Sequence, residues 1–145
     1  MNKDLSASLY VSPSEISESL NRSMIVKLIS SDKRKVMKNA LLRFIENGLP
    51  FVFPAEPGAI SRGIPTAHSA PSLKEYFSSE DVYVWPDANG NAKGQIINPL
   101  YPNQVKAAKD DERLYELLTL IDAIRVGKVR ESQKAIELLK AKIKE

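Results

Sequence analysis

A short polar stretch near the N-terminus has the side-chain types and spacing that read nucleic-acid bases. Asparagine forms two hydrogen bonds with adenine and arginine two with guanine, so Asn21 and Arg22 could contact base edges. Ser17 lies one helical turn before Asn21, and serine hydroxyls commonly bond phosphates. The residues expected to contact DNA in this stretch are Ser12, Ser14, Ser17, Asn21 and Arg22. An ordinary helical hairpin with a polar outer face is the alternative, which Glu15 and Glu18 favour because carboxylates repel phosphates.

Three consecutive basic residues, Lys33, Arg34 and Lys35, follow this stretch. With Lys38 and Arg43, and against two acidic residues, they give residues 31–50 a net charge of +3, the strongest local bias in a chain whose total is also +3. Lysine and arginine neutralise phosphates whatever the base sequence, and they supply much of the affinity of a DNA-binding protein. We expect these three side chains to hold the DNA backbone, and a solvated helix start is the alternative.

A third group of polar residues lies in residues 54–72, which are rich in glycine and proline. Flexible backbone amides beside Arg62 could hold an anion, so Arg62, Thr66 and His68 are candidates for a ligand or partner site. The alternative is an irregular loop that packs its apolar side chains onto the core. His68 is the only histidine and there is no cysteine, so neither a hydrolase triad nor a zinc site is expected. We expect no enzyme activity, no cofactor and no metal.

The residues expected to contact DNA need two short helices to position them. Leu5 and Leu9 share one face of the first helix, expected over residues 3–9. Ser12 can cap a second helix, expected over residues 13–29, and the glutamate three positions later completes a capping box. Two short helices that pack through apolar positions of this kind cross steeply and project the second helix into a major groove.

These residues resemble the helix-turn-helix family of bacterial transcription regulators. The residues that match the family pattern are Leu5, Leu9, Val11, Ser12, Ile16 and Ser17. The resemblance covers residues 3–30, and the whole chain is more loosely similar to MarR-like winged-helix regulators. It implies a regulator that binds double-stranded DNA as a homodimer. In the family a further helix precedes the pair, whereas three residues precede Asp4 here, so we expect a shortened chain or packing by another segment or subunit.

Periodicity and turn residues predict the remaining elements. Helices are expected over residues 33–46, 113–125 and 129–143, a short strand over residues 51–53, and a β-hairpin over residues 82–97. The hairpin is predicted from its Asn89-Gly90 turn. It could be a wing with Lys93 at its tip, or part of a small sheet that packs on the C-terminal helices, and we favour the sheet.

The predicted fold class is therefore α+β, with an N-terminal helix-turn-helix with or without a wing, a small β-hairpin element and a C-terminal helical pair. Residues 1–53 are assigned to DNA binding, residues 54–102 to the long loop and the hairpin, and residues 103–145 to dimerisation. The apolar stripe that suggests dimerisation consists of Leu114, Leu117, Leu118, Ile121 and Ile124. Packing of this stripe within one chain is the alternative.

Composition excludes several classes of protein. The absence of cysteine excludes disulfides and thiolate chemistry, and no apolar run approaches the roughly 20 residues of a membrane span. The polar N-terminus is unlike a signal peptide, so we expect a cytoplasmic protein without membrane contact. The sequence predicts a sequence-specific transcriptional regulator. The alternative is a protein-interaction module, such as an antitoxin-like subunit that binds a partner protein through residues 54–73.

Overall fold

The first two helices form a pair whose second member is capped as the sequence predicts. In the computed structural model, which describes residues 2–144, helices α1 (Asn2–Leu9) and α2 (Pro13–Ile25) are joined by a short turn. The Ser12 hydroxyl accepts a hydrogen bond from the backbone N–H of Glu15 at 3.2 Å, which satisfies one of the free donors of the first turn. The Glu15 carboxylate is directed along the helix and not back to Ser12, so the capping box is half formed.

A basic hairpin follows α2, which ends four residues before its predicted end. Ile29 pairs with Val36 across this hairpin, and the N–H of Met37 donates to the carbonyl of Leu28 at 2.8 Å. We call residues 28–37 the basic hairpin because its tip carries the three consecutive basic residues. The sequence predicts helices over residues 13–29 and 33–46, so this hairpin replaces the end of one predicted helix and the start of the next.

The next helix, α3 (Lys38–Asn47), begins five residues later than predicted. The Asp32 carboxylate accepts hydrogen bonds from the Ser30 hydroxyl at 2.5 Å and from the backbone N–H of Arg34 at 3.0 Å. Lys33 adopts a left-handed conformation with a φ of 62°. Because aspartate and serine side chains that bond the nearby backbone compete with helix formation, the predicted helix start at Lys33 is wrong.

Three short strands form a small closed sheet in place of the predicted hairpin. They are β1 (Ile60–Pro65), β2 (Tyr83–Pro86) and β3 (Ala92–Ile96). β1 is antiparallel to both other strands, with Arg62 opposite Lys93, whereas β2 and β3 run parallel to each other. Both predicted strands therefore exist, but the prediction that they pair as a hairpin is wrong.

The segment between β2 and β3 crosses β1 at close range, which explains this change in pairing. The N–H of Asp87 donates to the carbonyl of Arg62 at 3.1 Å. A Cβ atom on Gly90 would lie 2.2 Å from the carbonyl oxygen of Gly63, so only glycine permits this approach of the two backbones. Asn89 and Gly90 close a turn that begins at Asp87, where the N–H of Gly90 donates to the Asp87 carbonyl at 3.0 Å, and Gly90 also permits the backbone crossing.

Residues 54–72 are more regular than the sequence predicts. They contain β1, the 3₁₀ helix η1 (Ala67–Ser69) and the beginning of α5 (Pro71–Lys74). Prolines stand at the end of β1 and at the start of α5, where a missing N–H is tolerated. The predicted strand Phe51–Phe53 is also wrong, because its first residues belong to the short helix α4 (Leu49–Val52), with a proline in the first turn.

Helix α7 (Glu112–Val126) runs through the core, preceded by α6 (Gln104–Asp110) and followed by α8 (Val129–Lys144), which packs along it. The two predicted C-terminal helices are thereby confirmed. The main buried apolar side chains are Leu42, Ile45, Leu49, Leu73, Ile97, Leu120, Ala123, Ile124, Ala135 and Leu139. Trp85 of β2 packs with Leu118 of α7, so the sheet packs on the C-terminal helices as favoured. The apolar stripe of α7 is used for packing within the chain.

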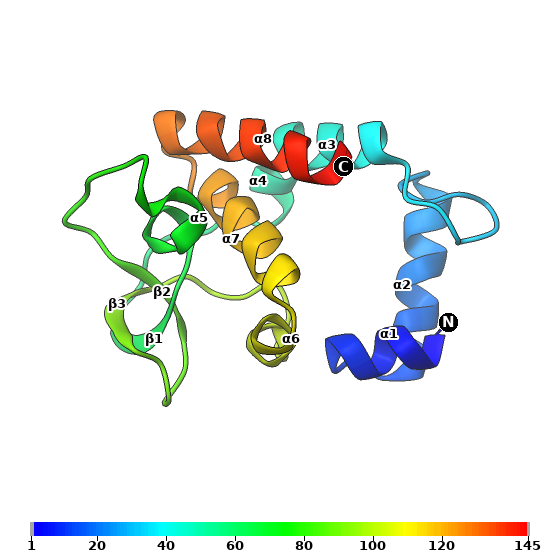
Figure 1. Cartoon of the computed structure of the whole chain (residues 1–145). Coiled ribbons are helices and arrows are strands. Elements are labelled where there is room, and N and C mark those ends of the chain that lie inside the picture. The colour runs from blue at the N-terminus through cyan, green and yellow to red at the C-terminus, as the bar shows by residue number, and fades with distance from the viewer. Residues whose placement is uncertain (1, 145) are drawn as a thin grey trace.

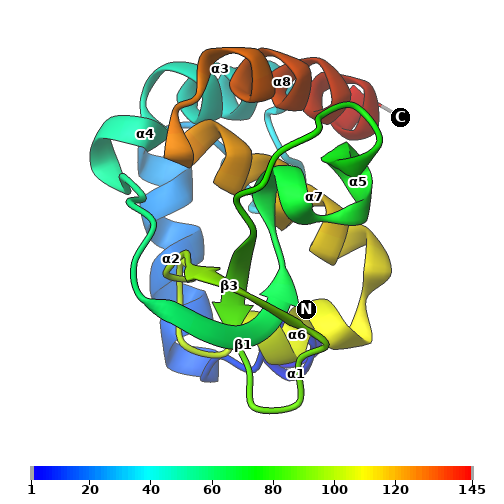
Figure 2. The same cartoon turned by 90° about the vertical axis from the view of Figure 1, so that its left-hand side faces the viewer.

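The α+β chain is arranged as an arm beside a larger body. Figure 1 shows α1, α2 and the basic hairpin, residues 2–37, standing to one side; we call them the arm. Figure 2 shows the sheet toward the viewer with α7 behind it and with α3 and α8 above. The arm meets the body where α1 contacts α6. There the Tyr10 hydroxyl donates to Asp110, and the Asn103 amide donates to the Tyr10 carbonyl at 2.8 Å.

Candidate nucleic-acid interface

The outer face of α2 is open to solvent. Ile16 is the single buried side chain of this helix. Of the five residues on α2 and its cap that were predicted to contact DNA, Ser17 is half-buried. The other four are exposed: Ser12, Ser14, Asn21 and Arg22. The fold therefore leaves the surface that the sequence assigned to DNA accessible.

Arg22 is held by acidic neighbours along α2. Its guanidinium donates to the Glu15 carboxylate at 2.8 Å and to the Ser19 hydroxyl at 3.0 Å, and Glu18 lies 3.9 Å away. The hydrogen bond from Arg22, followed by the one from Ser19, lowers the pKa of Glu15. The positive charge of Arg22 is thus balanced within the helix, although its side chain is 63% exposed.

The tip of the basic hairpin is joined to this same face. The Lys33 ammonium donates to the Asn21 side-chain oxygen at 2.5 Å, so two residues predicted from separate stretches of sequence come into contact. Arg34 and Lys35 are exposed beside them along the chain. The hydrogen bond from Ser30, followed by the one from the Arg34 backbone, lowers the pKa of Asp32, which keeps the turn carboxylate ionised. The signal that could have revealed this hairpin is the Ser-Ser-Asp sequence before the basic run, which suits a side-chain-capped turn.

Arg62, Thr66 and His68 do not form the loop site that the sequence suggested. Arg62 is exposed on β1, with its guanidinium 3.4 Å from the Gly90 carbonyl. Thr66 is fully buried and donates its hydroxyl to Asp122 at 2.6 Å. Two of the three candidates are therefore used inside the fold, because η1 turns them toward the core.

Asp122 of α7 is the centre of a buried polar network. It accepts hydrogen bonds from the Thr66 hydroxyl and the Trp85 indole, both at 2.6 Å, and from the Arg125 guanidinium at 2.8 Å. Arg125 in turn donates to the backbone carbonyls of Phe53 at 2.8 Å and Asn98 at 3.0 Å. Burial raises the pKa of Asp122, and these hydrogen bonds oppose that rise. The network ties α7 to the sheet and to two loops, and it makes Trp85 a core residue.

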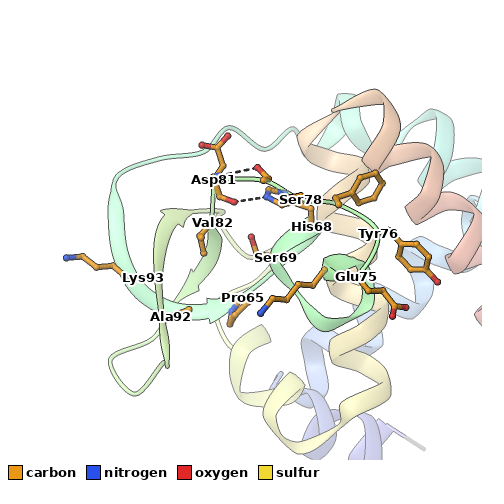
Figure 3. A pocket seen from close by; sticks show the side chains of 13 residues that line it. Pro65, His68, Ser69, Glu75, Tyr76, Ser78, Asp81, Val82, Ala92 and Lys93 are labelled. Carbon is orange, nitrogen blue, oxygen red and sulfur yellow. Dashed lines mark hydrogen bonds between the residues drawn. The ribbon is translucent and has the colours of Figure 1, made fainter.

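A cavity of about 720 Å³ opens between η1, α5 and the segment that leads into β2 (Figure 3). At its wall His68 is directed toward Asp81, with Nε2 2.8 Å from the Asp81 carbonyl oxygen. Nδ1 of His68 lies 3.7 Å from the Glu131 carboxylate. Both ring nitrogens thus face acceptors, and the imidazole joins η1 to the segment before β2 and to α8.

The structure was also searched for metal sites and membrane-spanning helices, and the chain was compared with known proteins. Among residues 2–144, no three His, Asp or Glu side chains are grouped in a way that could hold a metal ion. None of the helices described here combines the length and the apolar character needed to cross a membrane. Comparison with protein-family models, with curated proteins and with solved structures found no match.

Proposed function

We propose that the protein is a sequence-specific regulator of transcription that binds double-stranded DNA. In this proposal α1 and α2 form a helix-turn-helix unit and the basic hairpin serves as its wing. The hydrogen bond between Lys33 and Asn21 is the observation that carries the proposal. It places a cationic loop beside the exposed polar face of a helix, and DNA recognition uses both, since a helix reads base edges while cations hold phosphates.

In the proposed complex, α2 enters the major groove with Asn21 and Arg22 toward the bases. Lys33 exchanges Asn21 for a phosphate, which frees the asparagine amide to pair with adenine. Arg22 similarly exchanges Glu15 for guanine or for a phosphate. The serine hydroxyls at the N-terminus of α2 face the DNA backbone, where the helix dipole favours negative charge.

We further propose that the protein acts as a cytoplasmic homodimer. Two copies of a short recognition helix can occupy half-sites about one DNA turn apart, and their contacts then add. One arm presents one short recognition helix, α2 of 13 residues, so a second copy would double the contacts with DNA.

Fluorescence anisotropy tests the proposal. A labelled duplex from the region upstream of the gene is compared with a random duplex of the same length, at two salt concentrations. We expect tighter binding to the upstream duplex that persists at the higher salt. Weak binding to both duplexes that disappears at the higher salt would leave only a basic surface and would contradict a specific regulator.

Two variants of α2 locate the DNA-binding face. Arg22→Ala should weaken binding to the specific duplex by about tenfold and change binding to the random duplex less, because the variant has no guanidinium to pair with a base. Glu15→Gln should strengthen binding to both duplexes, since it removes a carboxylate that holds Arg22 and repels phosphates. Lys106→Ala, an exposed change on α6, is the control for general charge effects. Unchanged specific affinity in Arg22→Ala would show that α2 is placed wrongly.

The alternative of partner binding through residues 54–73 has less support. Thr66, His68 and Leu73 are buried within that segment and are held by the body. A partner could contact the exposed residues 56–60, but contact with Thr66, His68 or Leu73 would displace part of the core.

A further inference from the structure

A groove of about 440 Å³ lies where the arm joins the body, between the second strand of the basic hairpin, α3 and the end of α8. Val36, Met37 and Ala40 supply its apolar part. Val36 is 51% exposed and Met37 46% exposed, so two large apolar side chains are left in water. Single exposed apolar residues are ordinary, but neighbouring ones that line a groove mark a binding surface.

The edge of this groove is positively charged. Lys38 and Arg43 of α3 and Lys144 of α8 line it, and none of its lining residues within the described chain is acidic. Glu46, one turn beyond Arg43 on α3, is already paired with Lys140 at 3.5 Å. The groove therefore combines an apolar surface with the cations Arg43 and Lys144, which suits a ligand that is apolar and anionic at once.

We propose that this groove binds an acidic amphipathic segment of a partner protein. Apolar side chains of the segment would cover Val36 and Met37, while its carboxylates would face Arg43 and Lys144. Such a segment, laid as a helix into a groove, presents apolar anchors three or four residues apart. DNA fits the surface less well, because phosphates would match the cations and leave the apolar side chains in water. The inference does not depend on DNA binding by α2.

The test uses three fluorescein-labelled peptides of about 14 residues and the full chain. The first has leucine at every third or fourth position with glutamate between. The second has the same composition with the leucines spread around the helix, and the third has lysine in place of glutamate. Anisotropy should show the first peptide binding at least about tenfold more tightly than the other two, since only it matches both surface and charge.

Substitutions in the groove separate its two components. Met37→Ser and Arg43→Glu should each weaken binding of the first peptide by about tenfold, because one removes apolar surface and the other reverses a charge. Both residues are exposed, so the thermal unfolding midpoint should stay near that of the unsubstituted protein. Lys106→Glu, on α6, is the matched charge control and should leave peptide affinity unchanged.

Several results would overturn the inference. One is equal binding of the first and second peptides, or no binding of the first. Another is unchanged peptide affinity in Met37→Ser, which would leave only charge attraction. A third would come from Arg43→Glu: if this variant no longer bound the duplex but still bound the peptide, the groove would be a DNA surface. Peptide binding that depends on Met37, in a protein that binds no DNA, would support this inference and contradict the proposed function.

Discussion

The side-chain nitrogen of Lys33 lies 2.5 Å from the side-chain oxygen of Asn21, which ties the tip of the basic hairpin to the exposed face of α2. This contact lies within the arm and fixes the hairpin to α2 near one end of that helix. Near the other end, the turn before α2 is fixed to the body by Tyr10 and Asn103. Polar contacts therefore hold α2 to the hairpin near one end and to the body near the other, and each can be removed without touching the core.

Lys33→Ala should weaken DNA binding for every duplex sequence by a similar factor. The lysine is proposed to exchange Asn21 for a phosphate, and phosphate contacts contribute affinity without base preference. The measurement is the logarithm of the association constant against the logarithm of salt concentration. The slope of this plot should fall by about 1 for each phosphate that the variant no longer neutralises.

The matched control for this change is Lys27→Ala. Lys27 is exposed in the turn after α2, so it lies in the arm but outside the hairpin tip. An equal reduction of the slope in both variants would mean that the arm acts only through its overall charge. A loss of discrimination between duplexes in Lys33→Ala would instead assign this lysine to a base.

Tyr10→Phe should loosen the arm from the body. The change removes the hydroxyl that donates to Asp110 and keeps the ring. Because the chain has no cysteine, Lys27→Cys and Lys106→Cys can carry a pair of spin labels, one on the arm and one on α6. The distance distribution between the labels should broaden when Tyr10→Phe is added. Tyr76→Phe, an exposed tyrosine after α5, is the control, and an unchanged distribution would show that the hydroxyl does not hold the arm.

Helices with a strong local signal could be predicted from the sequence. The cap at Ser12 and the apolar periodicity of α7 and α8 are encoded by neighbouring residues, so their positions emerged within a few residues. The pairing of β2 with β3 could not be predicted, because it depends on the backbone of Gly90 meeting that of Gly63, residues far apart in sequence. The residues of the candidate site could be chosen from the sequence by their side-chain types. The contact between Asn21 and Lys33 could not be predicted, because it depends on the turn that Asp32 stabilises.

Asp122→Ala should destabilise the fold by about 3–5 kcal/mol, since removal of one partner leaves a buried cation unpaired. It also leaves the Thr66 hydroxyl and the Trp85 indole without their acceptor. The chain contains one tryptophan, so urea unfolding followed by its fluorescence reports on this network directly. Thr66→Val removes one neutral hydrogen bond and should cost less, about 1–2 kcal/mol. Equal costs for the two variants would mean that Arg125 does not depend on Asp122.

Gly90→Ala should disrupt the crossing of the segment between β2 and β3 over β1. The added Cβ atom would lie 2.2 Å from the carbonyl oxygen of Gly63, and this neighbour is backbone that cannot rotate away. A forced shift of this kind costs at least about 1–3 kcal/mol, which urea unfolding can measure. Gly58→Ala is the matched control, because its Cβ atom would meet the carbonyl oxygen of Ile96 at 3.6 Å, an ordinary contact, and stability should change by no more than about 0.5 kcal/mol. Equal stability of the two variants would contradict the close crossing and would favour the simple hairpin that the Asn-Gly sequence suggests.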